Sequence, residues 1–221
     1  MSFEYRAPVV LYEKMLYLYP ITNRMNIIFA TSNRGKLREA QEILGEGFSL
    51  STPAEFGITE DIPETGNTLE ENSLQKAEYV RSRTGLDCFA DDTGLEVDAL
   101  GGAPGVRTAR YAGEGHDFAA NMDKLLHELS GLDEPKRRRA RFRSVVTLLL
   151  GGEKHCFEGT LEGWIAFEKA GCGGFGYDPV FIADEYPDRT LAEIPEEAKN
   201  AISHRGKALR AMAAWMQEHR N

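Results

Sequence analysis

Two neighbouring carboxylates, Asp91 and Asp92, follow a short apolar segment in the sequence FADDTG. Adjacent carboxylates repel each other unless water solvates them or cations pair with them. Such a pair at the end of an apolar segment therefore indicates a solvated turn or a cation-binding site. Glu64, in the segment IPETGNT, is a third acidic candidate. Magnesium takes one or two protein carboxylates together with substrate phosphate oxygens. Glu64 and one aspartate meet that need, and the other aspartate could act as general base for a water, or the metal could lower that water's pKa. A solvated turn and a surface loop are the alternative interpretation.

A polar turn, TSNRGK, lies between an apolar segment and an amphipathic one. The first turn of a helix offers unpaired N–H groups and a partial positive charge, so phosphates bind there readily. The candidate phosphate-binding residues are Thr31, Ser32, Asn33, Arg34, Gly35 and Lys36. An ordinary capped turn is the alternative.

Two later segments could complete a nucleotide site. The glycine-rich segment GCGGFGYDP (171–179) carries Phe175 and Tyr177, whose rings could stack on a planar base, and Asp178, which could accept a hydrogen bond from the base edge. The segment KNAISHRGKA (199–208) supplies cationic or donor groups: Lys199, His204, Arg205 and Lys207. Each segment alone could be a structural turn or the polar face of a helix. Their joint occurrence with the acidic residues favours a nucleotide site.

Regular elements must position these segments, and the hydrophobic periodicity predicts them. Strands are expected at 26–30, 86–90, 140–150, 154–167 and 179–183, and 94–100 either pairs or continues the second strand past an acidic turn. Helices are expected at 36–44, 68–84, 117–129 and 196–219, the last with SHRGKA inside it or breaking it. Thr68 and Glu71 have capping-box spacing at the start of the second helix, and Gly85 ends it. Helices and strands alternate early and hairpins follow, which predicts a mixed-sheet α/β domain.

Composition narrows the class of partner. The net charge of −9 argues against a general nucleic-acid or anionic-membrane partner. No apolar run approaches the ~20 residues that cross a bilayer. Three widely spaced cysteines fit a reducing compartment, so we expect a cytoplasmic protein. The segment KRRRARFR (136–143) is the one basic cluster, and its alternative is a strand with a charged solvent face.

The segments FATSNRGKLREAQEIL, FADDTGLEVDALGGAPGVRTARYAG, GGFGYDPVF and AISHRGKAL together closely resemble the inosine triphosphate pyrophosphatase family, in the same order from about Met25 to the C-terminus. The resemblance implies an elongated mixed β-sheet with flanking helices, two lobes around a central nucleotide-binding cleft, and a homodimer. It implies magnesium-dependent hydrolysis of ITP, dITP or XTP to the monophosphate and pyrophosphate, which cleans the nucleotide pool.

The resemblance also assigns roles to residues of this chain. Glu64 and Asp92 would hold the metal, and Asp92 would also accept the proton of the attacking water. Our hypothesis for Asp91 is that it holds Asp92 in place, and a second metal ligand is the alternative. Lys76, facing out of its helix, is an additional phosphate candidate. The expected substrate-binding residues are Thr31 to Lys36, Thr93 (commonly Ser in the family), Phe175, Gly176, Tyr177, Asp178, Lys199, His204 and Arg205.

The sequence is compatible with more than one interpretation of its N-terminus and of its function. Residues 1–24 precede the family pattern, so we expect them to be an extension, native or not, that is dispensable for turnover, and 25–221 to be a single two-lobed domain. A Maf-type pyrimidine nucleotide pyrophosphatase would share the general chemistry. A nucleotide sensor would bind without turnover, and an RNA-binding protein would use 136–143.

Overall fold

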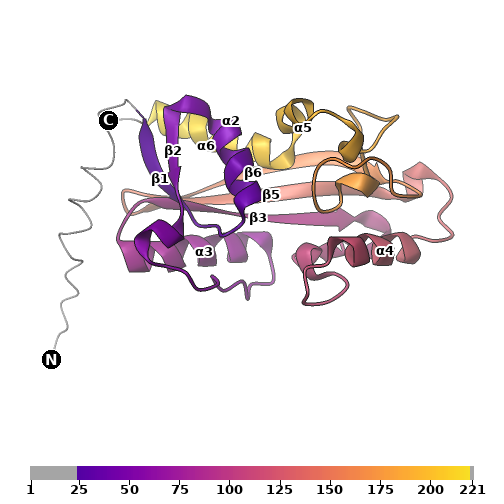
Figure 1. Cartoon of the computed structure of the whole chain (residues 1–221), viewed down its shortest axis with the longest axis horizontal. Coiled ribbons are helices and arrows are strands. Elements are labelled where there is room, and N and C mark those ends of the chain that lie inside the picture. The colour runs from indigo at the N-terminus through magenta and orange to yellow at the C-terminus, as the bar shows by residue number, and fades with distance from the viewer. Residues whose placement is uncertain (1–23, 220–221) are drawn as a thin grey trace.

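A computed structural model describes residues 24–219, and a seven-stranded mixed sheet forms its centre (Figure 1). The order is β2-β1-β3-β5-β6-β7, and β4 pairs with β3 outside this path. Both neighbours of β1 run parallel to it, whereas the remaining pairs are antiparallel. The strands are β1 (Met25–Phe29), β2 (Phe48–Ser51), β3 (Cys88–Val97), β4 (Pro104–Gly105), β5 (Arg139–Leu150), β6 (Glu153–Ile165) and β7 (Phe181–Ala183). The predicted α/β class is confirmed.

Helices cover both faces of this sheet. Figure 1 shows α3 and α4 along one face, and α2, α5 and α6 on the other. The long strands β3, β5 and β6 give the molecule its elongated shape. The helices are α2 (Arg34–Leu44), α3 (Leu69–Thr84), α4 (Phe118–Glu128), α5 (Glu196–Ile202) and α6 (His204–Glu218). Nearly all of the predicted extension 1–24 lies outside the described residues.

Local signals set the ends of α3. The hydroxyl of Thr68 accepts a hydrogen bond from the Glu71 N–H at 3.1 Å, and Gly85 ends the helix with a left-handed φ of 69°. The reciprocal half of the predicted capping box is absent, because the Glu71 carboxylate accepts instead from the N–H of Asn67 at 2.6 Å. The predicted start and stop are confirmed, with a different partner for Glu71.

The expected acidic turn after residue 90 is wrong, because β3 continues through it from Cys88 to Val97. Asp91 pairs with Val146 and Asp92 with Val145 of β5, and the pairing extends to Val97. Successive strand residues face opposite sides of a sheet, so the two carboxylates point into different layers. Each meets its own cation there, which removes the repulsion that made a turn plausible.

The expected helix at 196–219 is broken at Ser203, which has an extended backbone at φ −60° and ψ 145°. Its hydroxyl accepts a hydrogen bond from the Gly206 N–H at 2.9 Å and so caps α6. The break leaves His204 and Arg205 as the first residues of the new helix, directed toward the sheet.

The basic cluster at 136–143 is neutralised by carboxylates on neighbouring elements. Arg139 forms a bidentate pair with Asp184 at 2.6 and 2.9 Å. Arg143 contacts Glu158 of β6 at 2.7 Å, a diagonal pair because Arg143 lies opposite Thr160. Arg138 is buried and donates to four backbone carbonyls, those of Leu129, Leu132, Ile165 and Ala166. The alternative interpretation of this segment, a strand with a charged solvent face, therefore fits the structure better than a nucleic-acid-binding patch.

Close packing of α6 on β6 depends on a glycine. A Cβ atom added at Gly159 would lie 2.1 Å from the carbonyl oxygen of His204 and 2.7 Å from the amide nitrogen of Ala208. Both neighbours are backbone atoms, so relief requires α6 to move away from the sheet. Gly159 therefore sets the depth at which His204 and Arg205 sit.

We expect Gly159→Ala to lower the free energy of unfolding by about 1–3 kcal/mol, because overpacking forces a backbone shift. Urea unfolding followed by tryptophan fluorescence measures this loss. Gly47→Ala is the matched control, since a Cβ there meets nothing within 4 Å. Equal stability of the two variants would contradict the packing argument.

Candidate active site

A cavity of about 650 Å³ lies beside the open edge of β3. The pairing of β1 with β3 ends at Phe89, and the pairing of β4 with β3 begins at Leu95. Between these points the described chain leaves one edge of β3 uncovered, and the segment after β1 turns away into α2. Ligands commonly bind where neighbouring strands of an α/β sheet separate in this way.

Nearly all of the predicted site residues meet at this cavity. Its lining includes Thr31, Ser32, Asn33, Lys36, Glu64, Asp92, Thr93, Phe175, Gly176, Tyr177, Asp178, Lys199, His204 and Arg205. Three predicted residues, Arg34, Gly35 and Lys207, are not part of the lining, and Lys207 donates instead to the Thr160 carbonyl at 2.7 Å. Asp91 lies directly beneath it and is 1% exposed.

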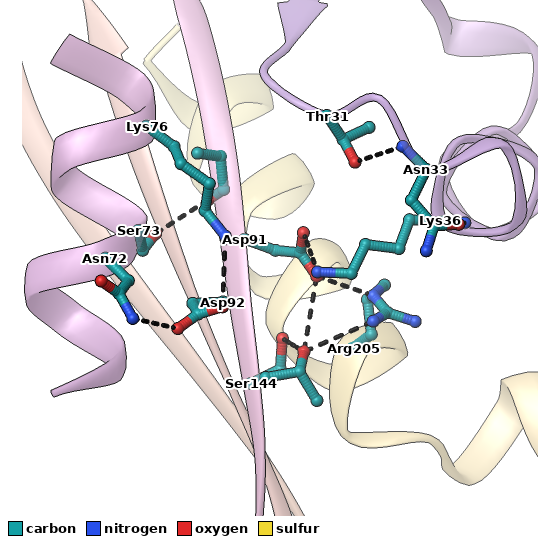
Figure 2. Close-up of polar contacts among 12 residues, drawn as sticks. Thr31, Asn33, Lys36, Asn72, Ser73, Lys76, Asp91, Asp92, Ser144 and Arg205 are labelled. Carbon is teal, nitrogen blue, oxygen red and sulfur yellow. Dashed lines mark hydrogen bonds and ion pairs between the residues drawn. The ribbon is translucent and has the colours of Figure 1, made fainter. Parts of the chain in front are cut away.

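Asp92 and Glu64 converge on one cation, the ammonium of Lys76. Its Nζ lies 3.1 Å from Asp92 Oδ1 and 2.5 Å from Glu64 Oε1. The Asn72 amide donates to the other oxygen of Asp92 at 3.1 Å, as Figure 2 shows. The expectation that Lys76 faces out of its helix is wrong. The side chain is buried because α3 packs this face against β3.

This arrangement fits a divalent cation. The two carboxylates already surround a positive group, and hard oxygen donors are what magnesium prefers. No cluster of three or more His, Cys, Asp and Glu side chains suited to a metal occurs within residues 24–219. Phosphate oxygens would therefore supply the remaining ligands. Burial alone would raise the pKa of Glu64, but Lys76 outweighs it and holds this pKa below its usual value.

Asp91 lies on the opposite face of β3 between two cations. Lys36 Nζ is 3.0 Å from its Oδ1, and Arg205 Nε is 2.9 Å from its Oδ2 (Figure 2). Arg205 also pairs with Glu39 of α2. Burial opposes ionisation, yet Lys36 and Arg205 hold the pKa of Asp91 well below its ordinary range. Asp91 thus ties α2 and α6 to the sheet while Asp92 faces the cavity.

The turn predicted to bind phosphate is a capped helix start. The Asn33 side chain accepts hydrogen bonds from the N–H groups of Gly35 at 2.9 Å and Lys36 at 3.1 Å. The N–H of Asn33 donates to Thr31 Oγ1 at 3.1 Å. The backbone of residues 31–36 therefore forms an ordinary capped turn, as the alternative interpretation of this segment predicts. The groups that reach the cavity are the side chains of Thr31, Ser32, Asn33 and Lys36.

The aromatic end of the cavity is formed by Phe175, which is 44% exposed. Asp178 fixes this loop, because its Oδ2 accepts from the Phe175 N–H at 2.8 Å and from Lys199 Nζ at 3.1 Å. Burial raises the pKa of Asp178 although Lys199 opposes the shift. Tyr177 does not offer the stacking face expected for it, because its ring is 2% exposed and its hydroxyl donates to the Thr108 carbonyl at 2.9 Å.

His204 also lines this cavity, and one of its ring nitrogens has no partner among the described residues. Its ring stacks on Phe142 with centroids 4.8 Å apart, and its Nδ1 is buried without a hydrogen bond to any described residue. Burial, followed by the charge of Arg205, lowers the pKa of His204 well below its usual value. The ring is therefore neutral near pH 7, and one tautomer offers an N–H donor to a ligand.

Three supporting residues, Asn72, Glu39 and Ser144, were not anticipated. Asn72 precedes Lys76 by one helical turn, and Glu39 follows Lys36 on the same face of α2, so helical spacing alone could have indicated both. Ser144, which accepts from the Thr93 hydroxyl at 3.1 Å, depends on the β3–β5 register and carries no local signal.

The fold and cavity define an α/β protein with a site suited to a nucleotide. The chain belongs to the Ham1 family, whose model matches residues 27–215. A Porphyromonas gingivalis protein called dITP/XTP pyrophosphatase is 53% identical over 83% of this chain and 93% of its own length. The Bacillus subtilis protein of the same name is 47% identical over 86% of this chain and 96% of its own length. The Ham1 protein of Staphylococcus aureus has a solved structure that superposes with a TM-score of 0.80 at 37% identity, covering 89% of this chain and all of that one.

Proposed function

We propose that this chain hydrolyses non-standard purine nucleoside triphosphates, ITP, dITP and XTP, to the monophosphate and pyrophosphate. The observation that carries the proposal is the convergence of Glu64 and Asp92 on one cation, beside a cavity that Lys36 also lines. Curated relatives at 44–53% identity carry the name dITP/XTP pyrophosphatase, which supports this substrate class.

In this proposal the triphosphate lies along Thr31, Ser32, Asn33 and Lys36, with Lys36 as the point charge. Glu64 and Asp92 hold magnesium, which would neutralise phosphate charge and lower the pKa of a bound water. Asp92 accepts the proton of the water that attacks the α-phosphorus. Lys76, which pairs with both carboxylates and lines the cavity, would add positive charge beside the phosphates once the metal is bound.

The base is read at the other end of the cavity. Hypoxanthine and xanthine carry a carbonyl at position 6, where adenine carries an amino group. Arg205 already donates to Asp91, Glu39 and Thr93, so the unpartnered Nδ1 of His204 is the better-placed donor for that carbonyl. A buried donor facing an amino group stays unpaired, which costs about 1–3 kcal/mol.

We expect His204→Phe to lower kcat/KM for ITP about 10- to 100-fold and to change kcat/KM for ATP much less. The phenyl ring preserves the stack on Phe142 but removes the donor. Competition assays with both nucleotides measure the selectivity ratio directly. An unchanged ratio would assign the reading of the carbonyl to another group.

A pyrophosphate-release assay tests the proposed function. The wild-type chain is incubated with ITP, dITP, XTP, ATP, GTP, dTTP and UTP, each with magnesium and with a chelator. We expect release from the first three only, and only with magnesium. Preference for dTTP or UTP would instead support the Maf-type alternative. Binding of ITP without release would support a nucleotide sensor.

Three further expectations accompany this proposal: magnesium as the metal, a homodimer, and a cytoplasmic location. The free thiols of Cys88, Cys156 and Cys172 are compatible with a reducing compartment. No helix within residues 24–219 has the length and apolar character needed to cross a membrane. Sedimentation analysis tests the dimer. Arg139 and Arg143 of β5 already pair with carboxylates, which disfavours the RNA-binding alternative.

RNA affinity measured at several salt concentrations tests this alternative.

A further inference from the structure

Phe118 is an exposed aromatic residue on the wall of the cavity that no motif of the sequence indicated. It is the first residue of α4 and is 38% exposed. Among the described residues the exposed large apolar side chains are Phe118, Phe167 and Phe175, and two of these, Phe118 and Phe175, line the cavity. An aromatic ring left open to water in a cavity that also holds charged groups indicates a ligand with an apolar part.

Phe118 and Phe175 come from different elements and contact each other in the lining of the cavity. Their ring centroids are 6.4 Å apart and the rings are inclined by 74°, an edge-to-face arrangement. A second contact joins the same segments, because Lys169 Nζ lies 2.6 Å from Asp123 of α4. The beginning of α4 is therefore held close to the glycine-rich loop.

The turn before α4 has an unusual backbone conformation directly before Phe118. His116, which also lines the cavity, has a φ of 51° and is the one non-glycine residue in the described chain with a positive φ. Asp117 follows and caps the helix, accepting a hydrogen bond from the Ala120 N–H at 3.0 Å. Strained backbone that its surroundings hold in place is concentrated at binding sites.

We propose that Phe118 is a second aromatic wall of the base site, which contacts the purine ring of the bound nucleotide together with Phe175. The inference rests on the proposed function for the identity of the base. The nitrogen of Lys199 lies 5.5 Å from the centroid of the Phe175 ring, and the guanidinium carbon of Arg205 lies 5.9 Å from it, so that ring has a polar neighbourhood. Phe118 supplies apolar contact to the base and none to the phosphates.

Calorimetric titration with inosine monophosphate and with inorganic pyrophosphate separates these contributions. We expect Phe118→Ala to weaken inosine monophosphate binding about 5- to 100-fold, the range of a lost base–aromatic stack. Pyrophosphate binding should change less than about twofold, because pyrophosphate has no base to stack. Phe118→Tyr, which keeps the ring, should bind both ligands like the wild type.

Phe167→Ala is the matched control, because Phe167 is 48% exposed but packs against Trp164 and Arg138 and does not line the cavity. Phe118→Ala behaving like this control would overturn the inference, as would equal weakening of both ligands or a wild type that does not bind inosine monophosphate. The titrations need no turnover. Failure of the proposed hydrolysis would therefore appear separately, in the pyrophosphate-release assay.

Discussion

Replacing Asp92 with Asn should reduce turnover of ITP by at least about 10³-fold, because the substitution removes both a metal ligand and the general base. The amide retains the size of the carboxylate, so β3 and its pairing with β5 should persist. Pyrophosphate release under saturating ITP and magnesium measures the loss. Circular dichroism of the variant checks the fold.

The control for this prediction is Asp98→Asn. Asp98 follows the same strand, but its carboxylate is on the surface, 3.0 Å from Arg141 and away from the cavity. Full activity is expected for it. An Asp92→Asn enzyme with a kcat near that of the wild type would remove Asp92 from the mechanism and leave Glu64 as the remaining acidic candidate.

Replacing Asp91 with Asn should instead destabilise the fold, by about 3–5 kcal/mol, since it leaves half-buried Lys36 without its anion and buried Arg205 with Glu39 alone. Lys36 and Arg205 both pair with Asp91, and Arg205 is 2% exposed. Urea unfolding at pH 7 measures the effect. Asp184→Asn is the control, because that exposed carboxylate pairs with Arg139 at the surface and should contribute no more than about 1 kcal/mol.

The pH dependence gives this prediction a second readout. The pKa of Asp91 is lower in the folded protein than in the unfolded chain, where an aspartate has a pKa of about 3.9. The stability that Asp91 adds is therefore fully present above about pH 5 and is lost as the pH falls below that value. The difference between wild type and Asp91→Asn should narrow in acid. A difference that stays constant from pH 7 to pH 3.5 would contradict the assigned ion pairs.

Local patterns predicted much of this molecule and long-range contacts accounted for the rest. The helix at Leu69–Thr84 follows from Thr68 and Gly85, whose effects are local. The strand Phe48–Ser51 was not predicted, because FSLS is too short for a clear alternation and depends on its parallel pairing with β1.

The site shows the same division. The charged and aromatic cavity residues of the four motifs were predicted because their chemical types are distinctive, whereas Phe118, His116 and the partners of each charge were not. That Lys36 pairs with Asp91 and Lys76 with Asp92 depends on which face of β3 each residue occupies. A turn after residue 90 could place both aspartates on one side of the sheet, whereas a continuous strand places them on opposite sides. The pairing of β3 with β5 shows that the strand is continuous.

The continuity of β3 also constrains how the family can vary. Asp91 and Asp92 exchange layers if the strand slips by one residue against β5, since side chains alternate between faces. Inserting or deleting one residue between Cys88 and Asp91 would turn Asp91 toward Lys76 and Asp92 toward Arg205. A change of one residue within this part of β3 would therefore separate both carboxylates from their present partners, whereas a change of two residues would keep each on its face.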